Sequence, residues 1–210
     1  MQIEKKNKTD RRIQRTRQAL RAALLELIKE KGYDAISTEE ITEHANVGRA
    51  TFYLHYKDKE DLLLEEFNEM ANERVQTLSE IPFSDWFPIQ ENESISTRPL
   101  LMVFQHIKDN SELYYILLKS AKSSRIVERI RKISTEAITK FVEAKLKTDP
   151  LPVFFNVPVD FFAAYFSGAL LSTVDWWLDE GMHYTPEEVT KLFRSLFFQG
   201  AKETIGLSAK

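Results

Sequence analysis

Apolar residues recur along most of the chain at steps of three and four positions, which is the period of an α-helix that buries one face. Alternation at every second position, the pattern of a half-buried strand, is almost absent. In the first helical segment, about 10–31, the apolar positions run from Ile13 to Ile28, and Gly32 marks the end. The pattern predicts an all-α fold.

Two short helices follow this first helix. Ser37 opens the earlier one with Glu40 three residues later, the spacing of a capping box. Residues 46–48 form a tight break, and the second short helix covers about 49–56. A longer helix followed by two short ones with a three-residue turn is the helix-turn-helix arrangement, whose second short helix enters the major groove of DNA.

The rest of the chain also shows helical periods, interrupted by two stretches that contain prolines. Asp58 is placed to cap a fourth helix over about 58–79. Later helices are expected over about 99–108, 111–119, 123–147, 159–180 and 186–205, with loops at 80–98 and 149–158. We expect a helix-turn-helix domain over 1–57, a connecting helix over 58–79 and a second helical domain over 80–210.

The charge of the chain is unevenly distributed. The net charge is −3, yet the segment from Met1 to Arg21 contains mostly Lys and Arg among its charged residues. A basic cluster on an acidic protein suits contact with DNA phosphates, because each neutralised phosphate releases counterions. A solvated basic tail explains the same pattern, and the charge alone does not separate the two.

The composition argues against several other classes of function. The chain has no cysteine, so disulfides, thiolate nucleophiles and thiol redox switches are excluded. Its four histidines are scattered, no HExxH motif occurs, and its six glycines form no phosphate loop, which argues against an enzyme. We expect no metal and no cofactor. The longest nearly apolar run, 161–174, is too short to span a membrane, so we expect a cytoplasmic protein without a membrane partner.

The residues around the two short helices form a long, ordered motif. The stretch Gly32 to Leu63, GYDAISTEEITEHANVGRATFYLHYKDKEDLL, contains a glycine-aromatic pair, a T-x-x-I-x-x-x-A helix, a turn and then TFY-x-H-aromatic-K-x-K-E-x-L. In this order the elements closely resemble the TetR family of regulators. The resemblance implies a DNA-binding transcriptional regulator, and it covers about the first quarter to third of the chain.

Helical geometry predicts which side of the second short helix faces DNA. At 100° per residue, Phe52 and Tyr56 share a stripe that packs on Ile41 and Ala45. The remaining positions point away or lie on the flanks: Arg49, Ala50, Thr51, Tyr53, Leu54 and His55. The guanidinium of Arg49 suits guanine or phosphate, the small Ala50 lets the backbone approach base edges, and Thr51 suits a base edge or a thymine methyl.

The resemblance also assigns the phosphate contacts. It places them on Tyr53, His55 and Lys59, together with Thr38 and Gly48 at the starts of the two short helices. Gly48 stands where many relatives have a capping serine, which leaves only a backbone N–H for phosphate. Leu54 occupies a position that is often polar, and either contacts thymine methyls or lies exposed.

The C-terminal segment Asp160 to Phe197 resembles the C-terminal domain of TetR-type regulators from Firmicutes through the spacing of Gly168, Trp176 and the Gly181–Met182 pair. The resemblance implies that the last two helices form a four-helix bundle in a homodimer. The expected interface residues are Phe162, Phe166, Leu192, Phe193, Leu196 and Phe197. A monomeric core is the alternative, but a palindromic operator requires two recognition helices.

Aromatic residues in the middle of the chain predict a pocket for a small apolar or aromatic effector. The candidates are Met102, His106, Tyr114, Tyr115, Leu118, Phe141 and Trp176, although the same residue types also build ordinary cores. The sequence therefore predicts a repressor that an effector releases from a palindromic operator. A coactivator or other protein-binding coregulator that retains the fold is the second hypothesis.

Overall fold

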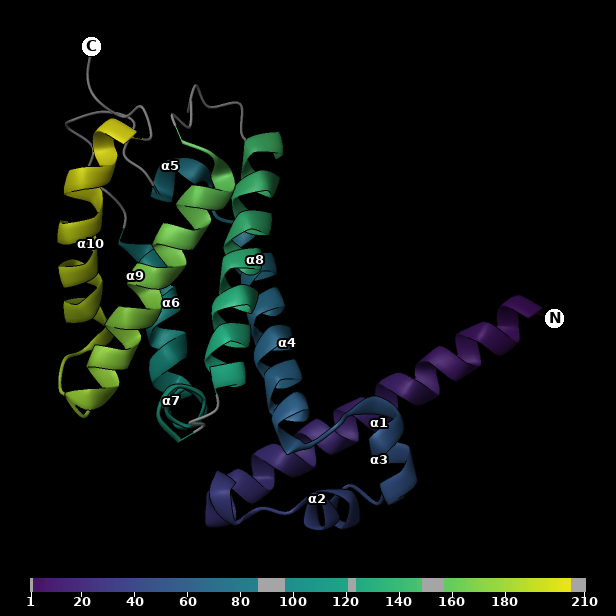
Figure 1. Cartoon of the computed structure of the whole chain (residues 1–210). Coiled ribbons are helices and arrows are strands. Elements are labelled where there is room, and N and C mark those ends of the chain that lie inside the picture. Colours follow the sequence, from purple (N-terminus) through teal and green to yellow (C-terminus); the bar gives the residue numbers. More distant parts are fainter. Residues whose placement is uncertain (1, 87–96, 121–123, 149–156, 205–210) are drawn as a thin grey trace. The chain divides into compact units, whose positions relative to one another are not determined.

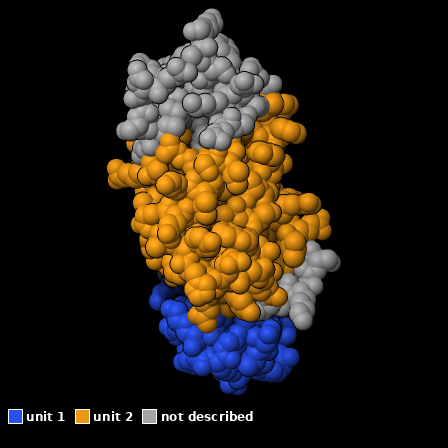
Figure 2. All heavy atoms as spheres, turned by 90° about the vertical axis from the view of Figure 1, so that its left-hand side faces the viewer, with its two compact units in different colours: residues 1–69 blue, residues 70–210 orange. Residues whose placement is uncertain are grey.

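The computed structural model describes residues 2–86, 97–120, 124–148 and 157–204, and every regular element in these ranges is a helix (Figure 1). The all-α fold is thus confirmed. Among these residues no helix is both long and apolar enough to cross a membrane. The chain divides into two compact units, 1–69 and 70–210 (Figure 2). The division falls within a helix, and the predicted domain limits at residues 57 and 80 stay predictions.

Unit 1 contains the helix-turn-helix and the helices that hold it. Its elements are α1 (Gln2–Lys31), η1 (Tyr33–Ala35), α2 (Thr38–His44), α3 (Arg49–His55) and the first part of α4 (Lys59–Ser79). α1 begins before the predicted start at Asp10, because the preceding Gln, Glu and Lys residues are good helix formers without an intervening glycine or proline. Asp58 caps α4 as predicted, since its Oδ1 accepts a hydrogen bond from the N–H of Asp61 at 2.8 Å.

The core of unit 1 forms where the apolar stripes of its helices meet. Leu24 of α1, Ile41 of α2, Phe52 of α3 and Leu62 of α4 are fully buried. Ala45, expected beside Ile41, is only half-buried, and Thr42 is buried instead. Burial of a large side chain from each helix fixes the two short helices, which are too short to be stable alone.

Ion pairs also join α1 to α4 within unit 1. Arg17 lies 3.5 Å from a carboxylate oxygen of Glu65, and Arg21 lies 3.4 Å from Glu66 and 3.5 Å from Glu69. Part of the basic run noted in the sequence is therefore paired with acidic residues of α4. These arginines orient α1 against α4 and are not free cations.

Unit 2 consists of the end of α4 and the helices after it. They are α5 (Phe83–Trp86), α6 (Arg98–Asp109), α7 (Ser111–Tyr115), the π-helical η2 (Ile116–Ser120), α8 (Ser124–Thr148), α9 (Val159–Asp179) and α10 (Pro186–Thr204). The predicted loop 80–98 contains α5, because the buried Trp86 packs on Phe141 with ring centroids 4.8 Å apart. The predicted helix 111–119 becomes π-helical in its second half. Most of the predicted loop 149–158 lies outside the described residues.

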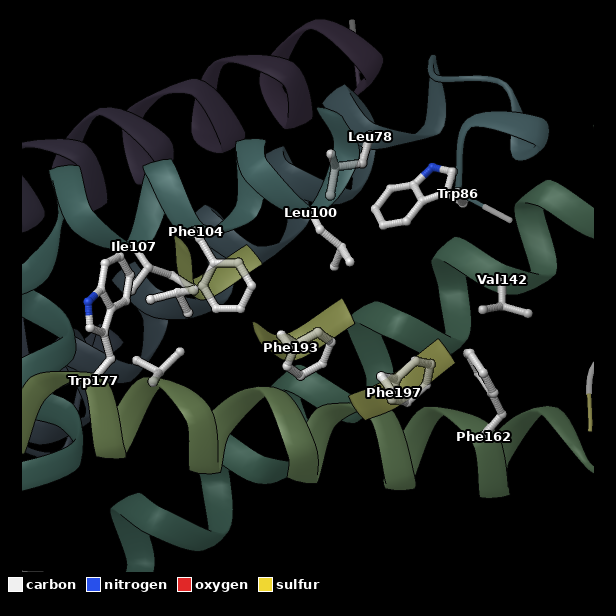
Figure 3. Packing of buried hydrophobic residues seen from close by; sticks show 12 residues of the cluster. Leu78, Trp86, Leu100, Phe104, Ile107, Val142, Phe162, Trp177, Phe193 and Phe197 are labelled. Carbon is white, nitrogen blue, oxygen red and sulfur yellow. The ribbon is translucent and has the colours of Figure 1, made fainter. Parts of the chain in front are cut away.

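Aromatic side chains dominate the core of unit 2. Phe104 of α6 lies between Trp177 of α9 and Phe193 of α10, with centroids 6.0 and 5.7 Å away (Figure 3). A hydrogen bond of 2.8 Å between the hydroxyls of Thr135 and Ser167 joins α8 to α9. The three helices α6, α9 and α10 thus bury one continuous apolar cluster.

The loop between α9 and α10 requires a glycine. Gly181 has a φ of +63°, and a Cβ added there would lie 3.3 Å from His183 Nε2. The turn closes on Trp177, whose Nε1–H donates to the carbonyl of Tyr184 at 3.0 Å and whose ring lies 5.8 Å from the ammonium of Lys108. Trp177, and not its neighbour Trp176, is therefore the fully buried tryptophan of this turn.

Candidate nucleic-acid interface and effector region

Local hydrogen bonds define both the start of α2 and the turn between α2 and α3. The hydroxyl of Ser37 accepts from the N–H of Glu40 at 3.2 Å, and Glu40 Oε2 accepts from the N–H of Ser37 at 2.9 Å. This is the predicted capping box. After α2 the chain reverses through Asn46, which has a φ of +51°, and the N–H of Val47 donates to the carbonyl of Thr42 at 2.9 Å. These bonds fix the angle at which α3 leaves α2.

α3 has one buried and one exposed face. Phe52 and Tyr56 are buried, and their rings lie 5.5 Å apart, as the helical stripe predicted. The opposite face consists of Arg49, Ala50, Tyr53 and Leu54, which are all exposed, Leu54 to 81%. A helix held through one face and exposing the other has the form required to enter a major groove.

The other predicted DNA contacts lie at the edges of this face. Thr51 and His55 are half-buried on the flanks of α3, so the exposed face is rotated toward Arg49 and Tyr53 relative to the prediction. Thr38 is half-buried at the first position of α2. Gly48 precedes α3 as an N-cap without a side-chain hydrogen bond, and a Cβ there would make an ordinary contact with Thr51 Oγ1 at 3.7 Å.

Arg49 is held by neighbours on two helices. It forms an ion pair with Glu39 of α2, and its guanidinium carbon lies 5.8 Å from the centre of the Tyr53 ring. The Tyr53 side chain and the carboxylate of Glu39 raise the pKa of Arg49 above its ordinary value. The contact with Glu39 is exposed and therefore weak, so Arg49 is positioned at the exposed face while it remains able to reach an anion.

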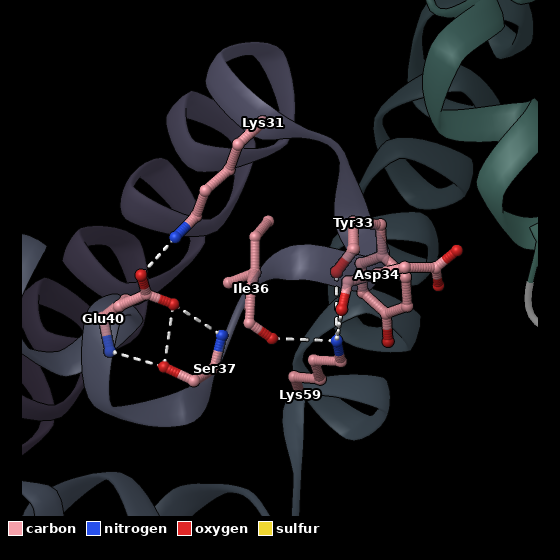
Figure 4. A network of polar contacts seen from close by, with 7 residues as sticks. All are labelled: Lys31, Tyr33, Asp34, Ile36, Ser37, Glu40 and Lys59. Carbon is pink, nitrogen blue, oxygen red and sulfur yellow. Dashed lines mark hydrogen bonds and ion pairs between the residues drawn. The ribbon is translucent and has the colours of Figure 1, made fainter.

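The ammonium of Lys59 binds backbone carbonyls of the segment between α1 and α2 (Figure 4). Its ammonium donates to the carbonyls of Tyr33 at 3.0 Å and of Ile36 at 2.8 Å, with the carbonyl of Asp34 at 3.5 Å. It also lies 4.5 Å from the centre of the Tyr33 ring. A phosphate contact requires the ammonium to leave these acceptors. In this structure Lys59 holds the connection between α1 and α2, and the phosphate contact implied by the family resemblance stays a prediction.

Glu40 makes a second set of contacts to the segment between α1 and α2. Glu40 accepts from Lys31 as well as from the hydroxyl of Ser37, the latter at 2.8 Å (Figure 4). The hydrogen bond from Lys31, followed by those from Ser37, lowers the pKa of Glu40 from 4.5 to about 2. Lys31, Glu40 and Lys59 thus hold the chain between α1 and α2 at both ends, and this fixes where α2 and α3 project.

The residues of the predicted dimer interface differ in how far they are buried in their own chain. Phe162, Phe193 and Phe197 are buried in the core of their own chain, and Phe166 packs on Phe197 with centroids 4.9 Å apart. These four rings pack within their own chain, Phe166 being half-buried, and their part in a dimer interface stays a prediction. The exposed large apolar side chains of α9 and α10 include Phe161 at 60%, Tyr165 at 61%, Leu192 at 45% and Leu196 at 83%. We call these four residues the outer apolar face.

The predicted effector residues separate into two groups. Met102, Tyr114, Leu118 and Phe141 are partly buried and pack against the aromatic core of unit 2. His106 is half-buried beside Tyr114, with ring centroids 6.2 Å apart. The other two predicted residues lie at the surface of the chain, and their role in a pocket stays a prediction. Tyr115 is 52% exposed, and Trp176 is 38% exposed and packs on Tyr184 at the surface.

Sequence reasoning missed three residues that the structure places at these sites. Glu39 orients Arg49, and Trp177 closes the α9–α10 turn. Arg74, on α4, donates to His106. None of them carried a signal of its own, because Glu and Arg on helices are ordinarily solvated and two adjacent tryptophans do not reveal which one is buried.

Comparison with known proteins supports both units. Residues 20–65 match the family described as bacterial regulatory proteins, tetR family, and residues 97–199 match the family described as transcriptional regulator C-terminal region. An HTH-type transcriptional regulator from Bacillus subtilis, YxbF, is 28% identical over 90% of this chain. The chain spans 46% of the length of that relative.

Two solved structures have the same fold. The TetR-family regulator from Syntrophomonas wolfei is 23% identical with a TM-score of 0.62, and the comparison covers 92% of this chain and 97% of the other. FadR from Thermus thermophilus, a repressor solved with lauroyl-CoA, is 15% identical with a TM-score of 0.64, covering 88% and 94%. With its helix-turn-helix, its C-terminal helical domain and both family matches, the chain belongs to the TetR family of DNA-binding transcriptional regulators, of the Firmicutes type.

Proposed function

We propose that this regulator is a repressor that binds a palindromic operator as a homodimer and is released by a small-molecule effector. The observation that carries the proposal is the exposed face of α3, where Arg49, Ala50, Tyr53 and Leu54 lie side by side while Phe52 anchors the helix from behind. Exposed apolar and cationic side chains on a rigidly held short helix suit base edges, because a major groove offers both acceptors and thymine methyls.

The proposed contacts with DNA are of two kinds. Arg49, Ala50, Thr51 and Leu54 face base edges and set the sequence preference. The phosphates are contacted by side chains on the edges of the helix-turn-helix and by the N–H of Gly48 at the start of α3. These phosphate contacts come from Thr38, Tyr53, His55 and the basic beginning of α1.

The homodimer is proposed from the outer apolar face. Tyr165 of α9 and Leu196 of α10 both expose large apolar side chains, and the ring of Phe197, the neighbour of Leu196 along the chain, lies 5.7 Å from that of Tyr165. Ala164 and Gly168 on the same side of α9 are small, so a second helix can approach closely. Pairing of α9 and α10 with their copies removes this surface from water and supplies the two recognition helices that a palindrome requires.

The effector is proposed to bind in unit 2, against the partly buried residues Met102, Tyr114, Leu118 and Phe141. The similar fold of a repressor solved with lauroyl-CoA supports an effector with a large apolar part. Two conformations with different affinity for DNA are then required, and the effector must bind the weaker-binding one more tightly.

The coactivator hypothesis makes a different prediction about DNA. A coregulator that no longer binds DNA has no need for an exposed Arg49 and Tyr53 on α3. A mobility-shift assay with the DNA upstream of the protein's own gene, at about 0.15 M salt, separates the two. The proposal expects a specific complex that excess random DNA does not remove. Equal affinity for both DNAs, or no complex at all, contradicts it.

A further inference from the structure

Polar side chains gather on α4, α6 and the start of α7, beside the apolar core of unit 2. The Nη2 of Arg74 lies 2.8 Å from Nδ1 of His106, and Nδ2 of Asn110 lies 3.2 Å from the same nitrogen. The ring of Tyr114 meets the imidazole edge-on, at 87°. Leu78, one turn after Arg74 on α4, belongs to the buried core shown in Figure 3.

The imidazole of His106 is neutral in this arrangement. Arg74 has only donors to offer, and the amide nitrogen of Asn110 is oriented by its second hydrogen bond, to the carbonyl of His106 at 2.8 Å. Both neighbours therefore donate to Nδ1, which must be unprotonated, so the proton is on Nε2. Burial, followed by the charge of Arg74, lowers the pKa of His106 to about 4, in agreement with this assignment.

The positive charge of Arg74 lacks a balancing anion among the described residues. Its side-chain partner, His106, is neutral, and its Nε is buried without a hydrogen-bond acceptor. The carboxylate that influences His106, Asp109, accepts from Gln105 at 2.9 Å on the exposed side of α6. A half-buried guanidinium with neutral neighbours lowers stability, because its lost hydration is not replaced by an opposite charge.

We propose that Arg74 and Asn110 form the anion-binding end of the effector site, with the neutral His106 as a positioning residue. The ligand is an organic anion that carries a carboxylate or phosphate group on an apolar body. The planar guanidinium offers paired donors to either group, and Asn110 adds an amide donor. The apolar body lies toward Met102, which occupies the same side of α6 one turn before His106, and toward the core beside Leu78. This inference rests on the proposed effector-controlled function.

Binding is tested on the full chain without DNA. Decanoate, decyl phosphate and 1-decanol have the same apolar chain and differ in the head group, and their affinities are measured by titration calorimetry. The wild type is expected to bind at least one of the two anions about tenfold or more tightly than the alcohol, and the preferred head group identifies the source of the anion. Equal affinities for all three compounds, or no binding at all, overturn the proposal.

Variants of the guanidinium give an independent test. Arg74→Met keeps the apolar stem and removes the charge, and Arg129→Met is the matched control because Arg129 is exposed on α8. Arg74→Met is expected to abolish the preference for the anion, while Arg129→Met keeps it. Without ligand, Arg74→Met is expected to raise Tm by about 2 to 4 °C, because an uncompensated charge is removed. A lower Tm together with an unchanged anion preference indicates a merely structural arginine and overturns the proposal.

Operator release is measured separately with the same compounds. If decanoate binds through Arg74 but leaves the operator complex intact, the anion site stands and effector control of DNA binding fails. If a compound releases the operator equally well from wild type and Arg74→Met, effector control stands and the anion site fails. The two proposals can therefore fail independently.

Discussion

The two units of this regulator are stabilised by different kinds of contact. In unit 1, short polar contacts decide the geometry: Glu40 and Lys59 hold the chain between α1 and α2, and Asn46 turns it into α3. In unit 2, large aromatic rings such as Phe104 and Phe193 pack between helices and form the continuous core. Directional contacts define one backbone conformation, whereas apolar packing accepts many arrangements of similar volume. Unit 1 is therefore suited to presenting a fixed face to DNA, and unit 2 to the effector and the second copy that we propose.

The largest effect is expected at the outer apolar face. Leu196→Glu places a charge from each protomer into the proposed dimer contact, and each unpaired buried charge costs several kcal/mol. Light scattering at micromolar concentration should give twice the chain mass for the wild type and the single mass for the variant. Val127→Glu, at a 53% exposed position on α8, is the control and should remain dimeric. A monomeric wild type contradicts the interface.

Removal of a core ring tests the aromatic packing directly. Phe193→Ala should lower the free energy of unfolding by about 3 to 5 kcal/mol, because removal of the ring creates a cavity between α6 and α10. The measurement is chemical denaturation at one fixed protein concentration, since a dimer's stability depends on concentration. Val127→Ala should change the value by less than about 0.5 kcal/mol. Similar losses in the two variants would mean that the core of unit 2 is not the principal source of its stability.

A bulky residue on α3 tests the specificity of unit 1. Thr51→Trp should weaken the specific operator by about 1 to 3 kcal/mol and leave binding to random DNA nearly unchanged, because the side chain faces base edges at the flank of the exposed face. Fluorescence anisotropy with both DNAs at one salt concentration measures the difference. Gln76→Trp, on the exposed side of α4, is the control. Equal losses for both DNAs would show that α3 faces DNA differently.

A variant of Lys59 tests whether this residue positions the backbone or contacts a DNA phosphate. Lys59→Met should lower the free energy of unfolding by about 1 to 2 kcal/mol and speed amide exchange in α2, because the carbonyls of Tyr33 and Ile36 lose their donor. The slope of log affinity against log salt should stay unchanged, and Lys57→Met is the control. A slope reduced by about one with normal stability would instead identify Lys59 as a phosphate contact.

The smallest effect is expected from the pH dependence of Glu40. Its pKa is depressed from 4.5 to about 2, so its contribution to stability is fully present above pH 4.5 and is lost as the pH falls toward 2. Glu40→Gln lacks this contribution. The difference in Tm between wild type and Glu40→Gln should therefore shrink over this range, whereas Glu43→Gln, at an exposed position of α2, should show no such trend. A difference that is constant with pH contradicts the capping role.

The sequence predicted the structure correctly where the role of a residue depends on its neighbours along the chain. The Ser37–Glu40 capping box, the Asp58 cap and the buried stripe of Phe52 and Tyr56 were all predicted correctly. It was less informative in unit 2, where Phe193 and Leu196 have the same helical period but opposite exposure. Three residues along a helix change direction by 300°, so a small error in the orientation of the stripe exchanges core and surface.

The sequence by itself determined the all-α fold, the helix-turn-helix and the TetR family, because capping spacings, glycine positions and helical periods act over a few residues. Tertiary structure alone decided that Lys59 binds carbonyls between α1 and α2, that Trp177 is buried while Trp176 is not, and that Arg74 meets His106. Each of these depends on contacts between helices that are distant along the chain. Side chains of the same type have equal propensities, and only the packed neighbours determine their roles.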